Sequence, residues 1–256
     1  MPSSLLVTLC TYNEAENLPG LIEEIHRQAP QSDVLIVDDN SPDGTGAIAD
    51  ELHAADKRIQ VLHRAEKKGL GAATRAGFEW AIAQGYELII NMDADFSHHP
   101  RHLPALIAGI ESVDVMIGSR YVSGGGVAGW GWRRKLMSGG INTYARLMLG
   151  LNTKDNSGSY RCYRTALLKQ INWSHFRSRG YAFQEEILFH CRMLGARFAE
   201  TPIVFEDRDR GHSKLDRREI LTALHDMLQL GLDRLTGRAR RATRRAKAEH
   251  RASDGP

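Results

Sequence analysis

The chain has 256 residues, 42% of them hydrophobic, and a formal net charge of only +3 from 34 basic and 31 acidic residues. This composition allows a sizeable core, and the near balance of charge excludes a body that binds polyanions in general. Cys10, Cys162 and Cys191 are scattered, which argues against a disulfide framework or a cysteine zinc site and favours a reducing compartment. The sequence shows neither a signal-peptide pattern nor a run of roughly 20 apolar residues. We therefore expect a cytoplasmic protein, or one peripheral on the cytoplasmic face of a membrane.

Strand-like and helix-like segments alternate over the first 120 residues. The expected strands are 5–9, 34–37, 59–62, 88–92 and 115–117, and the expected helices are 15–27, 45–55, 71–83 and 103–110. This β-α-β order is typical of an α/β fold with a mostly parallel sheet that helices cover on both faces.

The rest of the chain contains a glycine-rich segment over 123–131, which we expect to be a loop, and helical patterns over 136–151 and 216–235. Residues 238–251 hold seven lysines or arginines and one glutamate. We therefore divide the chain into a main domain (1–215), an amphipathic helix (216–237) and a basic, disordered tail (238–256). The helix could lie in a membrane interface or pack on the domain.

Asp93, Ala94 and Asp95 follow the apolar strand 88–92. Two carboxylates at this place are expensive to desolvate unless a cation meets them, and Mg²⁺ or Mn²⁺ prefers oxygen ligands. Ligands of open α/β sheets bind beyond the carboxyl ends of the strands. The pattern predicts a metal that holds a phosphorylated substrate. The alternative is a pair of solvated turn residues, one of which caps the next helix.

Polar motifs also follow the first two strands. Residues 11–14 read Thr-Tyr-Asn-Glu, and residues 38–43 contain three aspartates. Helix capping and turn chemistry explain some of these side chains, but they explain neither Tyr12 nor the need for three aspartates. We predict that Asp39 accepts hydrogen bonds from a nucleotide base or ribose.

Two further motifs fall short of known patterns. In residues 68–71, Lys-Gly-Leu-Gly, the third glycine of a dinucleotide-binding loop is replaced by Thr74, so we favour glycines that approach a phosphate or pack closely. His98 and His102 are four residues apart, as in a helical zinc site. Pro100 lies between them, however, and the glutamate of an H-E-x-x-H motif is missing.

Fixed cations gather at Arg208, Arg210 and Lys214. A solvated charge run is one interpretation, and a clamp on phosphate oxygens is the functional one. Residues 130–135 combine two tryptophans with three basic residues, which is the composition of a membrane-interface segment. The basic tail could bind anionic headgroups, nucleic acid or nothing.

Six motifs occur together in one order, at residues 11–14, 37–45, 69–77, 92–95, 118–121 and 210–215. In this order they resemble the family-two glycosyltransferases of the GT-A fold and, more narrowly, the dolichol-phosphate or polyprenol-phosphate mannose synthases. The resemblance covers about residues 5–230. Residues 180–186 resemble the family's stretch near the acceptor, and residues 155–158 resemble a shortened form of its Asp-Pro-x-Ser-Gly motif.

The resemblance implies roles for particular residues. Those implied to contact the donor nucleoside are Cys10, Tyr12, Glu14, Val37 and Asp39. Those implied at the diphosphate, ribose and metal are Asp93, Ala94 and Asp95, with Ser97 a further candidate ligand where the family often has glutamine. Those implied at the donor or acceptor phosphates are Arg120, Arg208 and Lys214. Asp93, Asp95 and Arg208 would carry the catalysis within residues 1–215.

The implied reaction is an inverting transfer of mannose from GDP-mannose to dolichyl or polyprenyl monophosphate, with Mg²⁺ or Mn²⁺ as cofactor and a β-linked product. The implied partners are the donor, the lipid acceptor and a membrane surface, and the need for an accessory membrane subunit stays open. We expect no specific nucleic acid partner. The alternatives are UDP-glucose or another sugar nucleotide, a non-lipid acceptor, or a nucleic-acid-binding module that uses the basic tail.

Overall fold

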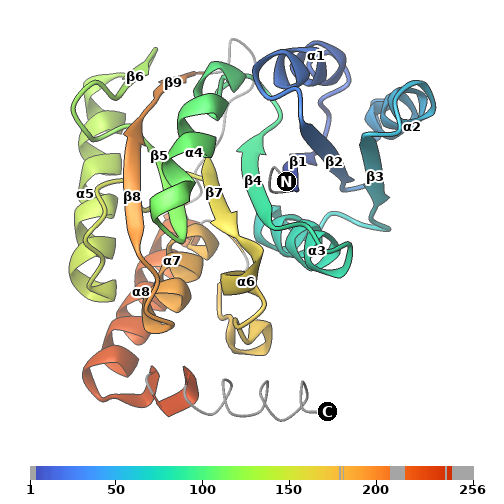
Figure 1. Cartoon of the computed structure of the whole chain (residues 1–256). Helices are drawn as coiled ribbons and strands as arrows, with labels where there is room; N and C mark the ends of the chain where they lie inside the picture. Colours follow the sequence, from blue (N-terminus) through green and yellow to red (C-terminus); the bar gives the residue numbers. More distant parts are fainter. Residues whose placement is uncertain (1–3, 179, 181, 208–216, 240, 244–256) are drawn as a thin grey trace, which may run out of the picture.

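A central sheet runs through the computed structural model, which describes residues 4–178, 180, 182–207, 217–239 and 241–243 (Figure 1). Its strand order is β3-β2-β1-β4-β7-β5-β8. The strands are β1 (Leu5–Thr11), β2 (Ser32–Asp38), β3 (Ile59–His63), β4 (Leu88–Asp93), β5 (Val115–Ser119), β7 (Arg161–Arg164) and β8 (Phe198–Pro202). Among these described strands β7 alone runs antiparallel to its neighbours. The predicted mostly parallel α/β fold is confirmed.

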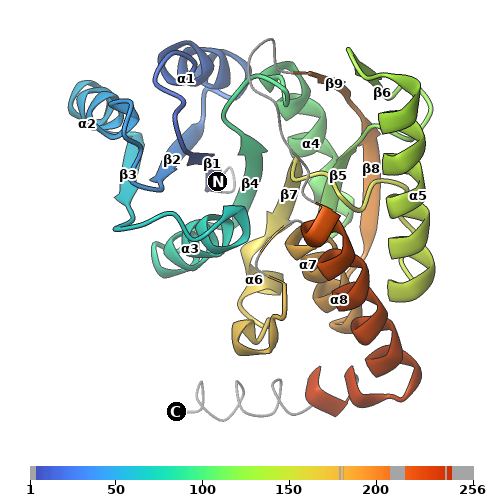
Figure 2. The ribbon, with the colours of Figure 1, turned by 180° about the vertical axis from the view of Figure 1, so that it is seen from behind.

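Helices cover both faces of the sheet (Figures 1 and 2). One face packs against α1 (Leu18–Gln28), α2 (Thr45–Ala55) and α4 (Leu103–Gly109). The other packs against α3 (Leu70–Ala83), α5 (Trp132–Leu149), α6 (Thr165–Leu168), α7 (Phe183–Met193) and α8 (Arg217–Leu235). Two short strands, β6 (Gly126–Ala128) and β9 (Val204–Glu206), pair beside this body. None of the described helices has both the length and the apolar character needed to cross a bilayer.

The strands alternate between the two cores that these helices complete. In β1, for example, Val7 packs on the side of α1 and α4, whereas Leu6 packs on the side of α3 and α7. Because both faces are buried, the parallel strands read as continuous apolar runs. This explains why the first five strands could be located from the sequence.

The strand order reverses direction between β1 and β4. β2 and β3 extend the sheet on one side of β1, and β4 begins the other side. The register sets Cys10 of β1 level with Val37 on one neighbour and Asp93 on the other. The carboxyl ends of β1, β2 and β4 therefore meet at one edge, which is where open α/β sheets bind ligands.

The glycine-rich start of α3 allows close packing. A Cβ atom on Gly71 would lie 2.8 Å from Cγ of Phe183 in α7, and Gly69 has a φ of +90° that favours glycine. The structure thus supports the close-packing interpretation of residues 69–71.

Replacing Gly71 with alanine should lower the free energy of unfolding by about 1–3 kcal/mol, because the new methyl group overpacks the contact with Phe183. Urea unfolding measures this loss. The matched control is Gly140→Ala in α5, where a Cβ would meet nothing within 4 Å. A Gly71→Ala protein as stable as the wild type would contradict this packing argument.

Candidate functional site

The loops that leave β1, β2 and β4 each contain one non-glycine residue in the left-handed conformation. These residues are Asn13 (φ 63°), Asn40 (φ 58°) and Phe96 (φ 62°), and the described chain has no others. Asparagine tolerates this conformation, whereas for phenylalanine it costs about 1–3 kcal/mol. Strain gathered at one sheet edge points to a functional site there.

Two of the three aspartates that follow β2 hold the loops together. Asp38 accepts a hydrogen bond of 2.6 Å from Ser41 Oγ, and Asp43 accepts one of 3.1 Å from the main-chain N–H of Ala15. The second bond joins the loop after β1 to the loop after β2, and Asp38 joins the ends of these strands by accepting a hydrogen bond of 3.0 Å from Thr11 Oγ1. Structural roles therefore account for two of the aspartates, and Asp39 is the one that they leave unexplained.

Asp39 and Tyr12 each face a cation from the loop after β3. Asp39, whose side chain is 5% exposed, forms an ion pair with Arg64. Burial raises the pKa of Asp39, and the Arg64 charge opposes that rise. The Lys67 ammonium lies 3.5 Å from the centroid of the Tyr12 ring. Neither cation belongs to the motifs of the sequence, so sequence reasoning missed both.

The other residues expected at the nucleoside lie at the same edge. Burial raises the pKa of the Cys10 thiol to about 12, and its Sγ is 3.7 Å from Thr74 Oγ1. Glu14 accepts a hydrogen bond of 2.8 Å from Asn17 Nδ2. The side chain of Val37 is fully buried, so a ligand would have to meet its main chain.

Asp93 is fixed in place at the end of β4. Its Oδ1 accepts a hydrogen bond of 2.8 Å from Ser159 Oγ, and its main-chain N–H donates to His98 Nδ1 at 3.1 Å. Because that nitrogen accepts, the imidazole is neutral, and burial lowers the pKa of His98 in the same sense. His98 therefore supports Asp93. The Nε2 atom of His102 accepts a hydrogen bond from the main-chain N–H of Val204.

The zinc alternative finds no support in the described part of the chain. No group of three or more histidine, cysteine, aspartate or glutamate side chains that could hold a metal ion occurs there. His98 and His102 instead serve as acceptors for main-chain N–H groups. Both imidazoles are explained by the structure that they hold together.

Asp95 and Ser97 form a compact oxygen pair beside Asp93. Asp95 Oδ1 accepts hydrogen bonds from the Ser97 main-chain N–H (3.1 Å) and from its Oγ (2.5 Å). The left-handed Phe96 between them turns the chain for these contacts. Ala94 is buried. Two carboxylates and a hydroxyl suit a hard divalent cation such as Mg²⁺ or Mn²⁺, which completes its shell with water or phosphate oxygens.

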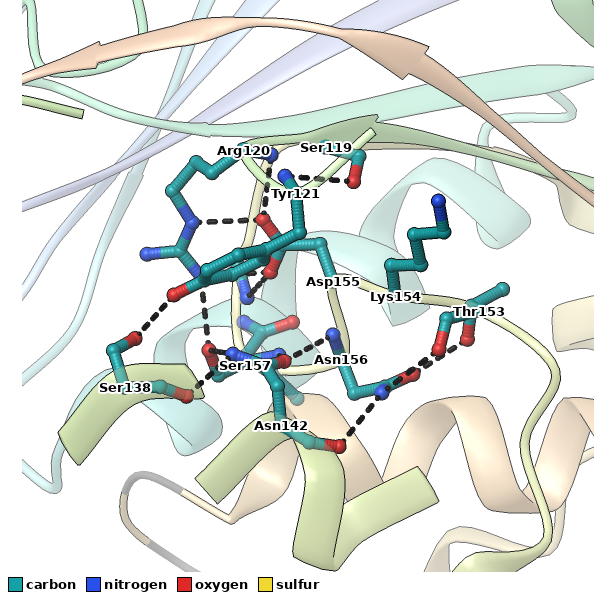
Figure 3. Close-up of polar contacts among 12 residues, drawn as sticks. Ser119, Arg120, Tyr121, Ser138, Asn142, Thr153, Lys154, Asp155, Asn156 and Ser157 are labelled. Carbon is teal, nitrogen blue, oxygen red and sulfur yellow. Dashed lines mark hydrogen bonds and ion pairs between the residues drawn. The ribbon is translucent and has the colours of Figure 1, made fainter. Parts of the chain in front are cut away.

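A second polar cluster follows β5 (Figure 3). Arg120 binds Asp155 in a forked ion pair, with Nε–Oδ2 and Nη2–Oδ1 distances of 2.7 Å, and Nη2 also donates to Ser157 Oγ at 2.8 Å. Although burial alone would raise the pKa of Asp155, Arg120 holds it below its usual value. The guanidinium carbons of Arg120 and Arg134 lie 5.6 and 4.1 Å from the Trp130 ring centroid.

Residues 155–159 connect the two clusters. Asp155 fixes Arg120, while Ser159 at the other end of this segment holds Asp93. Asn142 of α5 secures the middle, because its Oδ1 accepts the main-chain N–H of Asn156 at 2.6 Å (Figure 3). The sequence singled out residues 155–158 but gave no sign of this bridging role.

The structure gathers most of the predicted site residues at one edge of the sheet. They are Cys10, Tyr12, Glu14, Val37, Asp39, Asp93, Ala94, Asp95, Ser97 and Arg120. Arg208 and Lys214 lie outside the described residues. Sequence reasoning missed Arg64, Lys67 and Ser159, the role of His98 as acceptor for the Asp93 N–H, and the pairing of Asp155 with Arg120.

Glu185, in the segment that resembles the family's acceptor stretch, is a buried acid. It is 3% exposed, and its Oε2 has no hydrogen-bond partner among the residues that the structure describes. Burial raises the pKa of Glu185 to about 7, against an opposing effect from the charges of Arg161 and Arg120. The charges that act on Glu185 place this carboxyl group near Asp155 and Arg120.

Comparison with known proteins shows what the chain is similar to. It matches the family described as Glycosyl transferase family 2 over residues 6–171. It is 44% identical to the polyprenol monophosphomannose synthase of Mycolicibacterium smegmatis over 93% of the chain and 91% of that protein. It is 42% identical to the undecaprenyl-phosphate mannosyltransferase of Micrococcus luteus, over 89% of the chain and 94% of that protein.

Solved structures show the same fold at low sequence identity. A mannosyltransferase of Pyrobaculum calidifontis, solved in complex with GDP-Man and Mn²⁺, superimposes with a TM-score of 0.55. The match covers 100% of this chain and 77% of that one, at 15% identity. The likeness supports the fold of the chain independently of its motifs.

Burial of Glu185 should make the stability of the protein depend on pH. The folded state binds the proton with a pKa of about 7, against 4.5 for the ordinary carboxyl. The free energy of unfolding should therefore fall by up to about 3 kcal/mol as the pH rises between these values. Glu185→Gln should remove that fall and be the more stable protein at alkaline pH, as urea unfolding across the pH range measures.

The control for this measurement is Glu79→Gln, which alters a glutamate whose side chain is 47% exposed. It should keep the pH dependence of the wild type. If Glu185→Gln kept it too, the pH effect would have to come from other groups.

Proposed function

The chain belongs to glycosyl transferase family 2, and from that premise we propose that it transfers mannose from GDP-mannose to a polyprenyl monophosphate, with inversion at the anomeric carbon and with Mg²⁺ or Mn²⁺ bound. One observation carries the proposal. Residues 155–159 join an oxygen-rich cluster at Asp93 to a cluster that contains Arg120, as a metal-held diphosphate donor and a phosphate acceptor require. The names of two relatives that match nearly the whole chain specify the mannosyl group and the lipid phosphate.

The donor half of the proposed site is the edge formed by β1, β2 and β4. Asp39 accepts hydrogen bonds from the nucleoside, and Tyr12 presents a ring face that is partly exposed. Asp93 and Asp95, with Ser97 beside them, would hold the metal, which when bound stabilises the negative charge of the departing diphosphate. Ser159 and His98 keep Asp93 oriented for that role.

The acceptor half lies around Arg120. Its Nε and Nη2 are directed at Asp155 and Ser157, so a phosphate would meet the remaining Nη1 side. It would also meet the neighbouring Arg134, whose Nη1 forms an ion pair of 2.7 Å with Asp207 and would share its charge between the two anions. Arg208 and Lys214 complete the proposed phosphate clamp from the segment that follows β9. A phosphate monoester whose second pKa is near 6 is already largely anionic at neutral pH, so it attacks without a strong base. In-line attack on an α-linked donor gives a β-linked product.

We propose that α5 places this acceptor half at the cytoplasmic face of a membrane. On its exposed side Trp132, Leu136 and Leu147 are 71%, 70% and 60% exposed, and Arg133 and Lys135 lie among them. Amphipathic aromatic residues and cations of this kind bind interfaces that contain anionic lipids.

The helix α8 lies beside α5 and divides its apolar residues between the core and the surface (Figure 2). Met227 and Leu230 are buried against the body, while Leu228, Leu232 and Leu235 are exposed. Tyr144 of α5 donates a hydrogen bond to a main-chain carbonyl of α8, so the two helices form one surface. Part of α8 therefore packs on the domain, and part is available to the proposed membrane interface.

A transfer assay with the purified chain tests the function. We expect chelator-sensitive label in a polyprenyl phosphate from radiolabelled GDP-mannose, and a loss of about 10²-fold or more in Asp95→Ala with an unchanged melting temperature, because a ligand of the metal is gone. Arg58→Ala, a change of an exposed ion pair in the turn before β3, should retain turnover.

Other results of this assay would revise the proposal in defined ways. Label from UDP-glucose alone would change the donor. Donor hydrolysis without any lipid product would indicate a non-lipid acceptor or a missing membrane subunit. Near wild-type turnover in Asp95→Ala would remove the metal assignment.

The membrane proposal predicts that Leu136→Ser reduces binding to vesicles that contain anionic lipid by about tenfold or more, since an apolar side chain no longer enters the interface. Sedimentation with vesicles measures this binding. Leu70→Ser, which alters a leucine that is 45% exposed on α3, is the matched control. Equal binding by the two variants would contradict a membrane-facing role of α5.

A further inference from the structure

The loop between β3 and α3 is tied to Asp39 by more than one contact. Arg64 forms an ion pair with Asp39 Oδ1, and the main-chain N–H of Lys68 donates to the same carboxylate. The main-chain N–H of Arg64 donates to the carbonyl of Asp38 at 2.8 Å. The loop thus holds the one aspartate after β2 that the packing of the neighbouring loops leaves unexplained.

The Arg64–Asp39 pair lies at the edge formed by β1, β2 and β4, where we propose that the donor binds. The two side chains are 14% and 5% exposed. The charges of Arg64, Asp39 and Asp93 all influence the pKa of the Cys10 thiol, so the ion pair lies beside the end of β1. A buried ion pair of this kind adds little net stability, because desolvation offsets the attraction. Since stability does not account for the pair, its position in the proposed donor site suggests that it serves ligand binding.

We propose that Arg64 is a positioning residue for donor recognition, and that it fixes the Asp39 carboxylate as an ionised acceptor for N–H or O–H groups of the nucleoside. A carboxylate has about four acceptor sites, so binding Arg64 and the Lys68 N–H leaves capacity for a ligand. The inference rests on the proposed function, and it adds to the site a residue that none of the motifs contains.

Asp39 needs this partner because of its burial. Burial favours the neutral carboxyl group, which would present an O–H donor in place of an acceptor. The Arg64 ion pair opposes that preference and so favours the ionised carboxylate, whereas the neighbouring acid Asp38 adds to the effect of burial. Losing Arg64 would therefore weaken nucleoside binding even though Arg64 itself does not touch the nucleoside.

Calorimetric titration of the full chain with guanosine and with GDP tests the proposal without turnover. Arg64→Met should weaken binding of both ligands by the same factor, about tenfold or more, because the contact that it loses is to the nucleoside. Arg64→Lys should recover part of the affinity. Arg58→Met removes an equal charge from an exposed pair in the turn before β3 and should bind as the wild type does. Melting temperatures show that each variant is folded.

A double-mutant cycle separates positioning from direct contact. If Arg64 acts through Asp39, then adding Arg64→Met to Asp39→Asn should cause no further loss of affinity. An additive loss, a loss confined to GDP, or no loss in Arg64→Met would each overturn the proposal.

If the wild type binds uridine and UDP in place of the guanine ligands, the GDP-mannose assignment fails, and the same cycle on uridine decides the role of Arg64. Binding of neither nucleoside would overturn both.

Discussion

The convergence of carboxylates at the ends of two parallel strands is the constraint on which the rest of this structure depends. Asp38 ends β2 and Asp39 follows it, while Asp93 ends β4 and Asp95 lies just beyond, all at the edge where the strand order reverses. Partly desolvated negative charges at such close quarters must each be satisfied. Hydroxyl groups satisfy Asp38 and an arginine satisfies Asp39. For Asp93 and Asp95, we propose a divalent metal and the diphosphate that it carries as the partners, because such a cation prefers oxygen ligands.

The same segment of chain positions both halves of the site. Residues 155–159 hold Arg120 at one end and Asp93 at the other, and Asn142 of α5 holds the middle. We expect a displacement of α5, for instance by a membrane at its exposed face, to reach both groups. This connection would couple the helix that we propose to face lipid to the edge that we propose to bind the nucleotide.

How far the sequence predicted this structure varied along the chain. The strands up to β5 and the helices up to α4 were predictable, because parallel strands buried on both faces are apolar runs separated by amphipathic helices. The strand β7 was missed because it contains the fully buried Arg161, and α7 because Gln184, Glu185 and Glu186 are polar but buried. The expected helix over 136–151 begins earlier, at Trp132.

Within the site, motifs located Asp39, Asp93 and Arg120 but not their partners. The partners are 25, 66 and 35 residues away in the sequence, at Arg64, Ser159 and Asp155. No local pattern predicts such pairs, because only the fold brings them together. The same limit applies to Phe96, whose left-handed conformation serves the contact between Asp95 and Ser97.

The central claim is that this edge binds a nucleoside diphosphate through a divalent metal. Anomalous X-ray diffraction from crystals grown with GDP and Mn²⁺ tests that claim most directly. We expect a single manganese peak bonded to a carboxylate of the Asp93–Asp95 pair and to diphosphate oxygens, with the guanosine against Asp39. A bound GDP whose diphosphate lies away from Asp93 and Asp95, or a manganese ion elsewhere on the protein, would contradict it.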